Sequence, residues 1–161
     1  MNNESSFFLF MNRSLYYNMM QGCDNMTKRE LKELCYREVL EDCVVSVEMI
    51  VNRLDQIDQK KGVFDEDILN HDRMKTILDL ELSLANLCIL LRKMAENLFV
   101  VISDDMRRDM NSIIHSNRFE YDEKEMIVYS QKGKENVDLD AILSFCHSIL
   151  SNDKVLSSYD L

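Results

Sequence analysis

The amino-acid sequence predicts an all-α fold, an antiparallel bundle of about four to five helices with a short β-hairpin before the C-terminal helix. Three observations lead to this prediction. The 161 residues contain no proline and only three glycines, whereas average usage would give roughly eight prolines. Two long segments repeat apolar residues with a helical period. A short segment around residue 125 instead has the apolar pattern of paired strands.

The composition indicates one domain that spans residues 1–161 and is large enough to bury a core. Hydrophobic residues make up 46% of the chain and charged residues 30%, as in ordinary soluble proteins. The net charge of −10 disfavours unspecific adhesion to nucleic acid or to anionic membranes. Arg92, Lys93 and Glu96 interrupt the most apolar helix, and the apolar run 7–11 is too short for a leader. We therefore expect a cytoplasmic protein with no membrane partner.

The cysteines and histidines do not have the spacing of a metal site. The five cysteines are odd in number and include no Cys-x-x-Cys pair, which is typical of reduced thiols in a cytosolic protein. Cys88 lies among apolar residues and is expected to be an inert core residue. The three histidines, His71, His115 and His147, are scattered along the chain. We expect neither a metal nor another cofactor.

The first half of the chain is predicted to begin with a helix or ordered arm over residues 1–24, followed by a long helix. Thr27 and Glu30 have the spacing of a capping box, so the long helix should begin there. It should run to about Lys60, where Gly62 stops it. Its buried positions are expected to be Leu31, Leu34, Cys35, Val39, Val45, Met49, Ile50 and Leu54.

A second long helix is predicted from about Asp65 to Val101. Ser103 then caps a shorter helix, and acids in its first turn suit the positive end of the helix dipole. The buried stripe of the second long helix is expected to consist of Leu78, Leu82, Ala85, Cys88, Ile89, Leu91 and Leu98.

The pattern changes from helical to strand-like after His115. Phe119, Tyr121 and the run 126–129 predict two short strands around an acidic turn, with a loop over 131–134. Asp138 is expected to cap the last helix. Residues 152–161 are expected to form a flexible tail. The core-facing residues of the last helix should be Ile142, Leu143, Phe145, Cys146, Ile149 and Leu150.

A candidate catalytic group lies at the end of the shorter helix. Arg108 and His115 are seven residues apart and fall on one helix face, with Asn111 between them. The histidine can transfer the proton of an RNA 2′-OH or of the leaving oxygen, and the arginine can stabilise the charged phosphate. The Asn111 amide could orient the imidazole, and Asp109 could orient the arginine. Nearby cations that could bind RNA are Arg107, Arg118, Lys132 and Lys134.

The same residues also have a simpler interpretation, since arginine and histidine are common on exposed helix ends and a cation suits the C-terminal dipole. His147 is more readily a helix-face residue than a ligand. His71 is expected on a solvated helix surface. The aromatic residues near the N-terminus are expected to pack in the core or across a dimer interface rather than to stack on bases.

Residues 103–151 resemble the HEPN superfamily. The resemblance rests on Arg108 followed by a polar residue, on His115 at a helix end, and on the hairpin and closing helix that follow. It implies a HEPN-like helical bundle and, in many members, a metal-independent endoribonuclease of a prokaryotic toxin–antitoxin or phage-defence system. It also implies a homodimer with facing Arg/His pairs, and a nucleotidyltransferase-like antitoxin or a defence-complex partner. By this resemblance Arg108, Asp109 and His115 are the catalytic residues.

One position departs from the commonest form of the family motif, Arg-Asn-x-x-x-His. In that register Asn111 and His115 match, but Met110 stands where the arginine belongs. Either the chain is an active member with the longer spacing from Arg108, or it is a non-catalytic interaction module with the same fold. A third hypothesis is a virally encoded bundle that sequesters a host helix in an apolar groove.

Overall fold

The computed structural model describes residues 26–62, 65–122 and 125–152. The predicted N-terminal helix or arm over 1–24 therefore lies outside the described residues, as does the predicted tail beyond residue 152. The chain divides into two compact units, residues 1–34 with 153–161 and residues 35–152. Each is considered by itself below.

The described part of the first unit contains the start of helix α2 (Lys28–Gln59). The Thr27 backbone N–H donates to Glu30 Oε2 at 3.0 Å, and the Glu30 N–H donates to Thr27 Oγ1 at 3.1 Å. These reciprocal hydrogen bonds satisfy two backbone donors that the helix itself leaves unpaired. The predicted capping box is confirmed.

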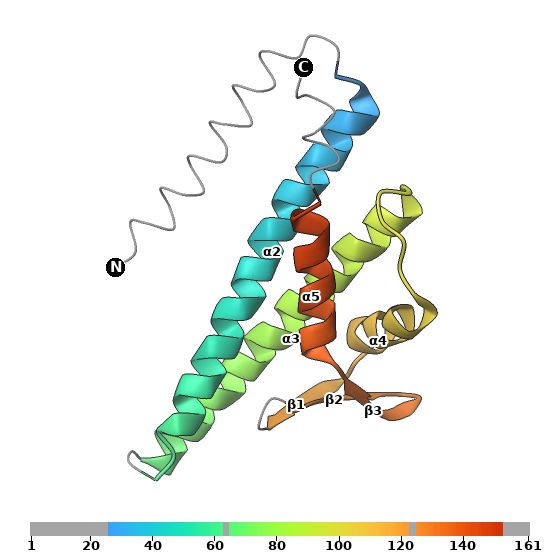
Figure 1. Ribbon diagram of the computed structural model, residues 1–161. Helices are drawn as coiled ribbons and strands as arrows, with labels where there is room; N and C mark the ends of the chain where they lie inside the picture. The colour runs from blue at the N-terminus through green and yellow to red at the C-terminus, as the bar shows by residue number, and fades with distance from the viewer. Residues whose placement is uncertain (1–25, 63–64, 123–124, 153–161) are drawn as a thin grey trace, which may run out of the picture. The chain divides into compact units, whose positions relative to one another are not determined.

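The second unit is mostly helical, with a small antiparallel sheet before its last helix. In Figure 1, α5 lies alongside α2 and α3, and α4 lies beside α3. After the part of α2 that belongs to this unit, the elements are α3 (Glu66–Glu96), α4 (Asp104–Ile114), β1 (Arg118–Asp122), β2 (Glu125–Ser130), β3 (Gly133–Val137) and α5 (Leu139–Leu150). The predicted combination of a helical fold with strands before the last helix is confirmed.

The core of this unit is built from apolar stripes whose residues alternate three and four positions apart. That spacing keeps one helix face directed at its neighbours over several turns. On α2 the stripe consists of the buried Leu40, Val44, Val47 and Leu54 with the partly buried Val51, and on α3 it consists of Ile77, Leu80, Leu84, Leu87, Leu91 and Met94.

The predicted stripes were largely placed on the wrong helix faces. Leu34 and Leu54 of α2 and Cys88 and Leu91 of α3 are buried as expected. Both helices carry apolar residues on more than one face, so the period alone did not identify the inward face. The residues expected inside but found exposed are Cys35, Val39, Val45, Met49, Leu78, Leu82, Ile89 and Leu98.

Helix α3 ends five residues earlier than predicted. The Phe99 N–H donates to the Met94 carbonyl at 2.9 Å, and the Leu98 N–H donates to the Ala95 carbonyl at 3.0 Å. This is a Schellman motif, in which the residue after the cap adopts a left-handed conformation. Leu98 takes that position with φ of 61°, where glycine is usual. The sequence contained no glycine to mark this helix end.

The sheet has three antiparallel strands in the order β1-β2-β3, one more than the predicted hairpin. Phe119 pairs with Val128, and Met126 pairs with both Tyr121 and Val137. These five side chains are buried on one face. The first two residues of strand β3 were expected to belong to a loop over 131–134. Only Val137 of the five strand residues is buried, so the strand has no alternating apolar pattern that the sequence could show.

The caps of the two shorter helices are confirmed. Ser103 Oγ accepts a hydrogen bond from the Met106 N–H at 3.2 Å, and Asp138 Oδ1 accepts one from the Ala141 N–H at 3.0 Å. The caps fix where α4 and α5 begin.

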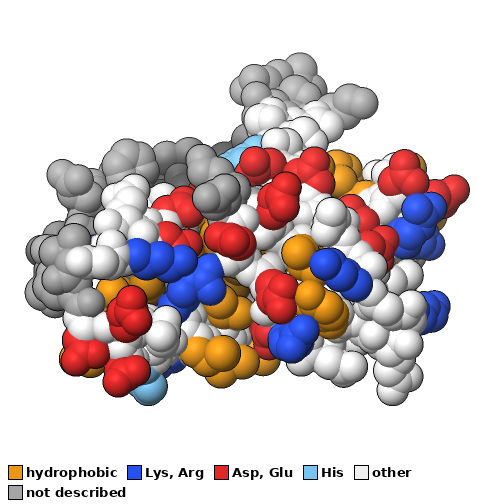
Figure 2. Space-filling model, turned by 90° about the horizontal axis from the view of Figure 1, so that it is seen from below, with side chains coloured by type: hydrophobic (Ala, Val, Ile, Leu, Met, Phe, Trp, Pro, Cys, Tyr) orange, Lys and Arg blue, Asp and Glu red, His pale blue; other side chains and the backbone are white. Residues whose placement is uncertain are grey.

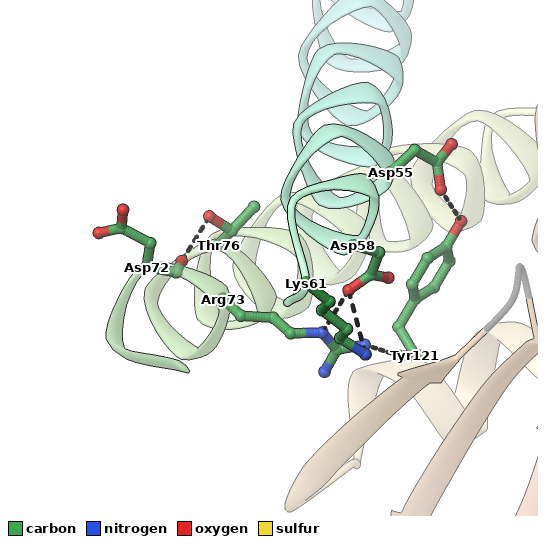
Figure 3. Close-up of polar contacts among 7 residues, drawn as sticks. All are labelled: Asp55, Asp58, Lys61, Asp72, Arg73, Thr76 and Tyr121. Carbon is green, nitrogen blue, oxygen red and sulfur yellow. Dashed lines mark hydrogen bonds and ion pairs between the residues drawn. The ribbon is translucent and has the colours of Figure 1, made fainter. Parts of the chain in front are cut away.

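Arg73 of α3 joins the last turn of α2 to the sheet, as Figure 3 shows. Its Nε donates to Asp58 Oδ1 at 2.9 Å, and an Nη donates to the Tyr121 carbonyl. The Tyr121 hydroxyl in turn donates to Asp55 Oδ1 at 3.4 Å. Burial and the Asp55 carboxylate raise the pKa of Tyr121 to about 12. One cation therefore ties together three elements far apart in the sequence.

None of the described helices is both long enough and apolar enough to cross a membrane. The thiols of Cys88 on α3 and Cys146 on α5 are fully buried. Burial, and to a smaller extent a neighbouring thiol, raises the pKa of each to about 12. Cys88 is thus an inert core residue, as predicted.

The neighbouring valines of α2 test the placement of the buried stripe. Val44 is 1% exposed and Val45 is 42% exposed. Val44→Ala should lower the free energy of unfolding by about 2 kcal/mol, because it removes two buried methyl groups and leaves a cavity. Val45→Ala has the same helix-propensity change and should cost less than about 1 kcal/mol. Urea denaturation of both variants measures the difference, and equal costs would contradict the assigned stripe.

The cysteines should differ in their reaction with iodoacetamide at pH 8. With a pKa of about 12, the thiols of Cys88 and Cys146 are almost entirely protonated at this pH and are shielded from reagent. Cys35 is exposed and should be alkylated in the native protein. Peptide mapping by mass spectrometry should find Cys88 and Cys146 modified only after unfolding in urea. Their rapid modification in native protein would contradict the packing around them.

Candidate functional site

Helix α4 presents a polar face because its apolar face is buried. Met110 and Ile113 enter the core, with Met106 and Ile114 packed partly against it. Residues on the opposite side of the same helix must then face outward. Arg108, Asn111 and His115 all lie on this outward side and are exposed.

A hollow of about 800 Å³ lies between this face of α4 and the turn that joins β2 to β3. It brings together five of the eight predicted site residues, which come from two segments about twenty positions apart in the chain. Arg108, Asn111 and His115 line it from α4, and Lys132 and Lys134 line it from the turn and the start of β3. The remaining lining residues are Ser112, Asn117, Ser130, Gln131, Gly133 and Glu135.

The hollow is locally cationic in an acidic protein. Arg108, Lys132 and Lys134 are set against the single carboxylate of Glu135, so its lining carries a net charge of +2 when His115 is neutral. The whole chain carries −10. On the face shown in Figure 2, acidic and basic side chains are interspersed with hydrophobic ones. A hollow lined by three cations is suited to an anionic ligand with several charges.

Arg108 is paired with Asp105 rather than with Asp109, which was expected to orient it. One Nη of Arg108 lies 3.4 Å from Asp105 Oδ1, and the arginine side chain is 68% exposed. An ion pair this exposed contributes little to stability. The guanidinium can therefore leave Asp105 and turn to a ligand phosphate at a small cost in free energy.

Asp109 does not line the hollow. Burial raises the pKa of its carboxyl, and the nearby carboxylate of Glu135 raises it further, whereas Arg108 acts in the opposite direction. Asp109 thus lies among other acids on the side of α4 toward β3 and α5. It contributes negative potential beside the hollow.

His115 is the C-cap residue of α4, so its imidazole projects from the very end of the helix. Its backbone N–H donates to the Asn111 carbonyl at 3.0 Å. In the described structure the Asn111 amide makes no side-chain hydrogen bond to the imidazole, contrary to the expected orienting role. Both side chains instead face the hollow, where each is available to a ligand.

The other two predicted RNA-binding residues lie elsewhere. Arg107 lines a second, smaller hollow of about 260 Å³ with Arg92 and Glu96 of α3. The Arg118 guanidinium lies 4.2 Å from the ring centroid of Tyr129 and 3.4 Å from Glu120. This stacked and paired arrangement holds Arg118 on the surface of the sheet.

The structure also bears on the two possible registers of the motif. Met110, which occupies the arginine position of the commoner motif, is 2% exposed and packs in the core. A side chain at this position cannot reach the hollow without leaving the core. In this fold only the longer spacing places an arginine and a histidine together, and that arginine is Arg108.

Sequence reasoning missed Ser112 and Glu135. The Ser112 hydroxyl donates to Glu135 Oε2, which joins α4 to β3 at the edge of the hollow. Glu135 could not be found from the sequence because its strand was expected to begin as a loop. Ser112 lies between Arg108 and His115 and carried no signal beyond being polar.

The two remaining histidines lie outside the hollow. His147 of α5 contacts Glu48 of α2, so it is a helix-face residue, as predicted. His71 is exposed next to Asp72, with 3.7 Å between its Nδ1 and the carboxylate. Within residues 26–62, 65–122 and 125–152, no three metal-ligating side chains gather into a site.

Comparisons of the chain with protein-family models, with curated proteins and with solved structures each find no match.

Proposed function

We propose that the protein is a metal-independent endoribonuclease whose active site is the cationic hollow beside α4. The observation that supports this proposal best is the convergence of Arg108 and His115 with Lys132 and Lys134 on one hollow. Three cations suit the phosphodiester backbone of a nucleic acid, and an exposed imidazole among them suits proton transfer. RNA carries both the phosphates and a 2′-OH that can act as an internal nucleophile.

In the proposed reaction, His115 removes the proton of a 2′-OH, whose oxygen attacks the adjacent phosphorus. The bond from phosphorus to the 5′ oxygen breaks, and that oxygen leaves with a proton from an imidazolium. The products are a 2′,3′-cyclic phosphate and a 5′-OH. Arg108 stabilises the charge that builds on the phosphoryl oxygens, and the two lysines hold the flanking phosphates. No step needs a metal, because the nucleophile belongs to the substrate.

The HEPN resemblance extends this proposal. A HEPN-like bundle would place two such hollows face to face in a homodimer, so that one His115 accepts a proton while the other donates one. It would also place the enzyme in a prokaryotic toxin–antitoxin or phage-defence system, with a nucleotidyltransferase-like antitoxin or a defence complex as partner.

A second candidate is a non-catalytic interaction module with the same fold. One observation favours it: α3 exposes several large apolar side chains. In that case the hollow would bind an anionic partner without cleaving it.

Cleavage of a mixed RNA pool by purified protein in EDTA tests the first proposal. His115→Ala should lower the rate about 10²- to 10⁴-fold because the proton acceptor is removed. Arg108→Ala should lower it about 10²- to 10³-fold because the phosphate charge is left unpaired. Denaturing gel electrophoresis of labelled RNA measures both rates.

Matched controls come from the same chain. Arg107→Ala removes the neighbouring arginine, which lies outside the hollow, and His147→Ala removes a histidine on another helix. Both should retain cleavage. An inactive wild type, or cleavage that survives both His115→Ala and Arg108→Ala, would leave the interaction module as the better proposal.

The two lysines should affect RNA binding rather than the chemical step. In a His115→Ala background, which prevents cleavage, Lys132→Ala with Lys134→Ala should weaken binding of single-stranded RNA. The plot of the logarithm of the RNA association constant against the logarithm of salt concentration has a negative slope. The magnitude of this slope should decrease by about 0.7 for each phosphate that is no longer neutralised. Fluorescence anisotropy at several salt concentrations measures it. Lys60→Ala with Lys61→Ala makes the same charge change just after α2, at residues that do not line the hollow. An equal effect of that change would refute a local interaction.

A further inference from the structure

The exposed side of α3 carries a continuous apolar stripe that the core does not use. Met74, Leu78, Leu82 and Ile89 are 61%, 49%, 69% and 40% exposed. At 100° per residue these four positions fall within about 80° of one another. The buried stripe lies on the other side of the same helix, so α3 has two apolar faces. Such a stripe on an otherwise charged surface marks a contact with another chain.

The order of side chains along the stripe is self-complementary. Suppose that a second copy of α3 crosses the first one antiparallel at Leu82. Position 78 of one helix then faces positions 85 and 86 of the other, and position 74 faces positions 89 and 90 of the other. The large Leu78 side chain then meets the small Ala85, and Met74 meets Ile89. Leu82 meets its own copy on the two-fold axis. The Leu78–Ala85 layer sets a large side chain against a small one, which allows close approach of the two helices there.

The charges that flank the stripe favour the same antiparallel direction. Asp67 and Asp72 flank its N-terminal end, where Lys75 is exposed and Arg73 is engaged by Asp58 and the Tyr121 carbonyl. Arg92 and Lys93 flank its C-terminal end, where Glu96 lies 3.5 Å from Arg92. The helix dipole accounts for acids in the first turn of α3, but Asp72 lies beyond that turn. In an antiparallel pair each acidic end lies beside a basic end of the partner, whereas a parallel pair would oppose like charges.

We propose that this stripe is a homodimer interface, in which a second copy of the chain packs its α3 antiparallel across a two-fold axis at Leu82. The interface is isologous, so each contact occurs twice. A substitution at Leu82 therefore meets the same substitution in the partner across the two-fold axis. The stripe shares no residue with the hollow beside α4, so this proposal does not depend on the proposed ribonuclease activity. It also defines a surface other than the facing hollows that the HEPN resemblance implies.

Sedimentation equilibrium of the full chain measures the dimer dissociation constant. Leu82→Glu places two like charges against each other on the axis and should raise this constant at least about 100-fold. Met49→Glu makes the same change at a 64% exposed position on α2 and should leave it unchanged. Circular dichroism of each variant checks that the fold is retained.

Cysteine crosslinking tests the direction of the pair. In a Cys35→Ser background, Leu82→Cys should form a disulfide-linked dimer on mild oxidation, because the two copies of this residue face each other. Met74→Cys should not, because it faces the other end of the partner helix. If both variants crosslink, the helices are parallel and the proposed geometry is overturned.

Charge reversal supplies an independent readout. Asp67→Lys with Asp72→Lys should weaken self-association, as should Arg92→Glu with Lys93→Glu, while an equimolar mixture of these two variants should form a heterodimer. A wild type that sediments as a monomer at all concentrations would show that another segment or another protein covers the stripe. That result, or a dimer indifferent to Leu82→Glu, overturns the proposal.

Discussion

Burial of one face of α3 is the constraint on which the rest of the second unit depends. The stripe from Ile77 to Met94 meets α2 and α5 in the core, and α4 and β1 pack against the same helix. The Phe119 N–H of β1 donates to Glu81 of α3 at 2.8 Å, which fixes the sheet to the helix. Arg73 ties this assembly to the end of α2. A helix that contacts every neighbouring element sets the position of each of them.

The hollow follows from that packing. Met110 and Ile113 must enter the core that α3 organises, and this turns Arg108, Asn111 and His115 outward. The sheet is held against the same helix, and its β2–β3 turn lies beside the outward face of α4. The cations of the turn thus meet the cation and imidazole of the helix without any local sequence signal.

Electrostatics at the hollow reflect a balance between neighbouring charges. Glu135 lies at its edge and accepts a hydrogen bond from Ser112, while Asp109 lies just outside with a raised pKa. Inside the hollow, Lys132, Lys134 and Arg108 outnumber the single acid Glu135. In a chain with a net charge of −10, an anionic ligand would be attracted by this local patch and repelled elsewhere.

The sequence by itself determined the local features of the chain. Caps at Thr27, Ser103 and Asp138 are set by side chains within three residues of the backbone groups they bind, so the helix starts were predictable. The shared face of Arg108 and His115 followed from helix geometry in the same way.

The tertiary structure alone decided which helix faces are buried, where α3 ends, and that β3 is a strand. Both long helices have apolar residues on more than one face, and only the neighbours available in space select one of them. Leu98 ends α3 in a conformation that glycine usually supplies, and β3 pairs through backbone hydrogen bonds that its side chains do not signal. The meeting of Lys132 and Lys134 with His115 depends on contacts between distant segments, and residue spacing cannot encode them.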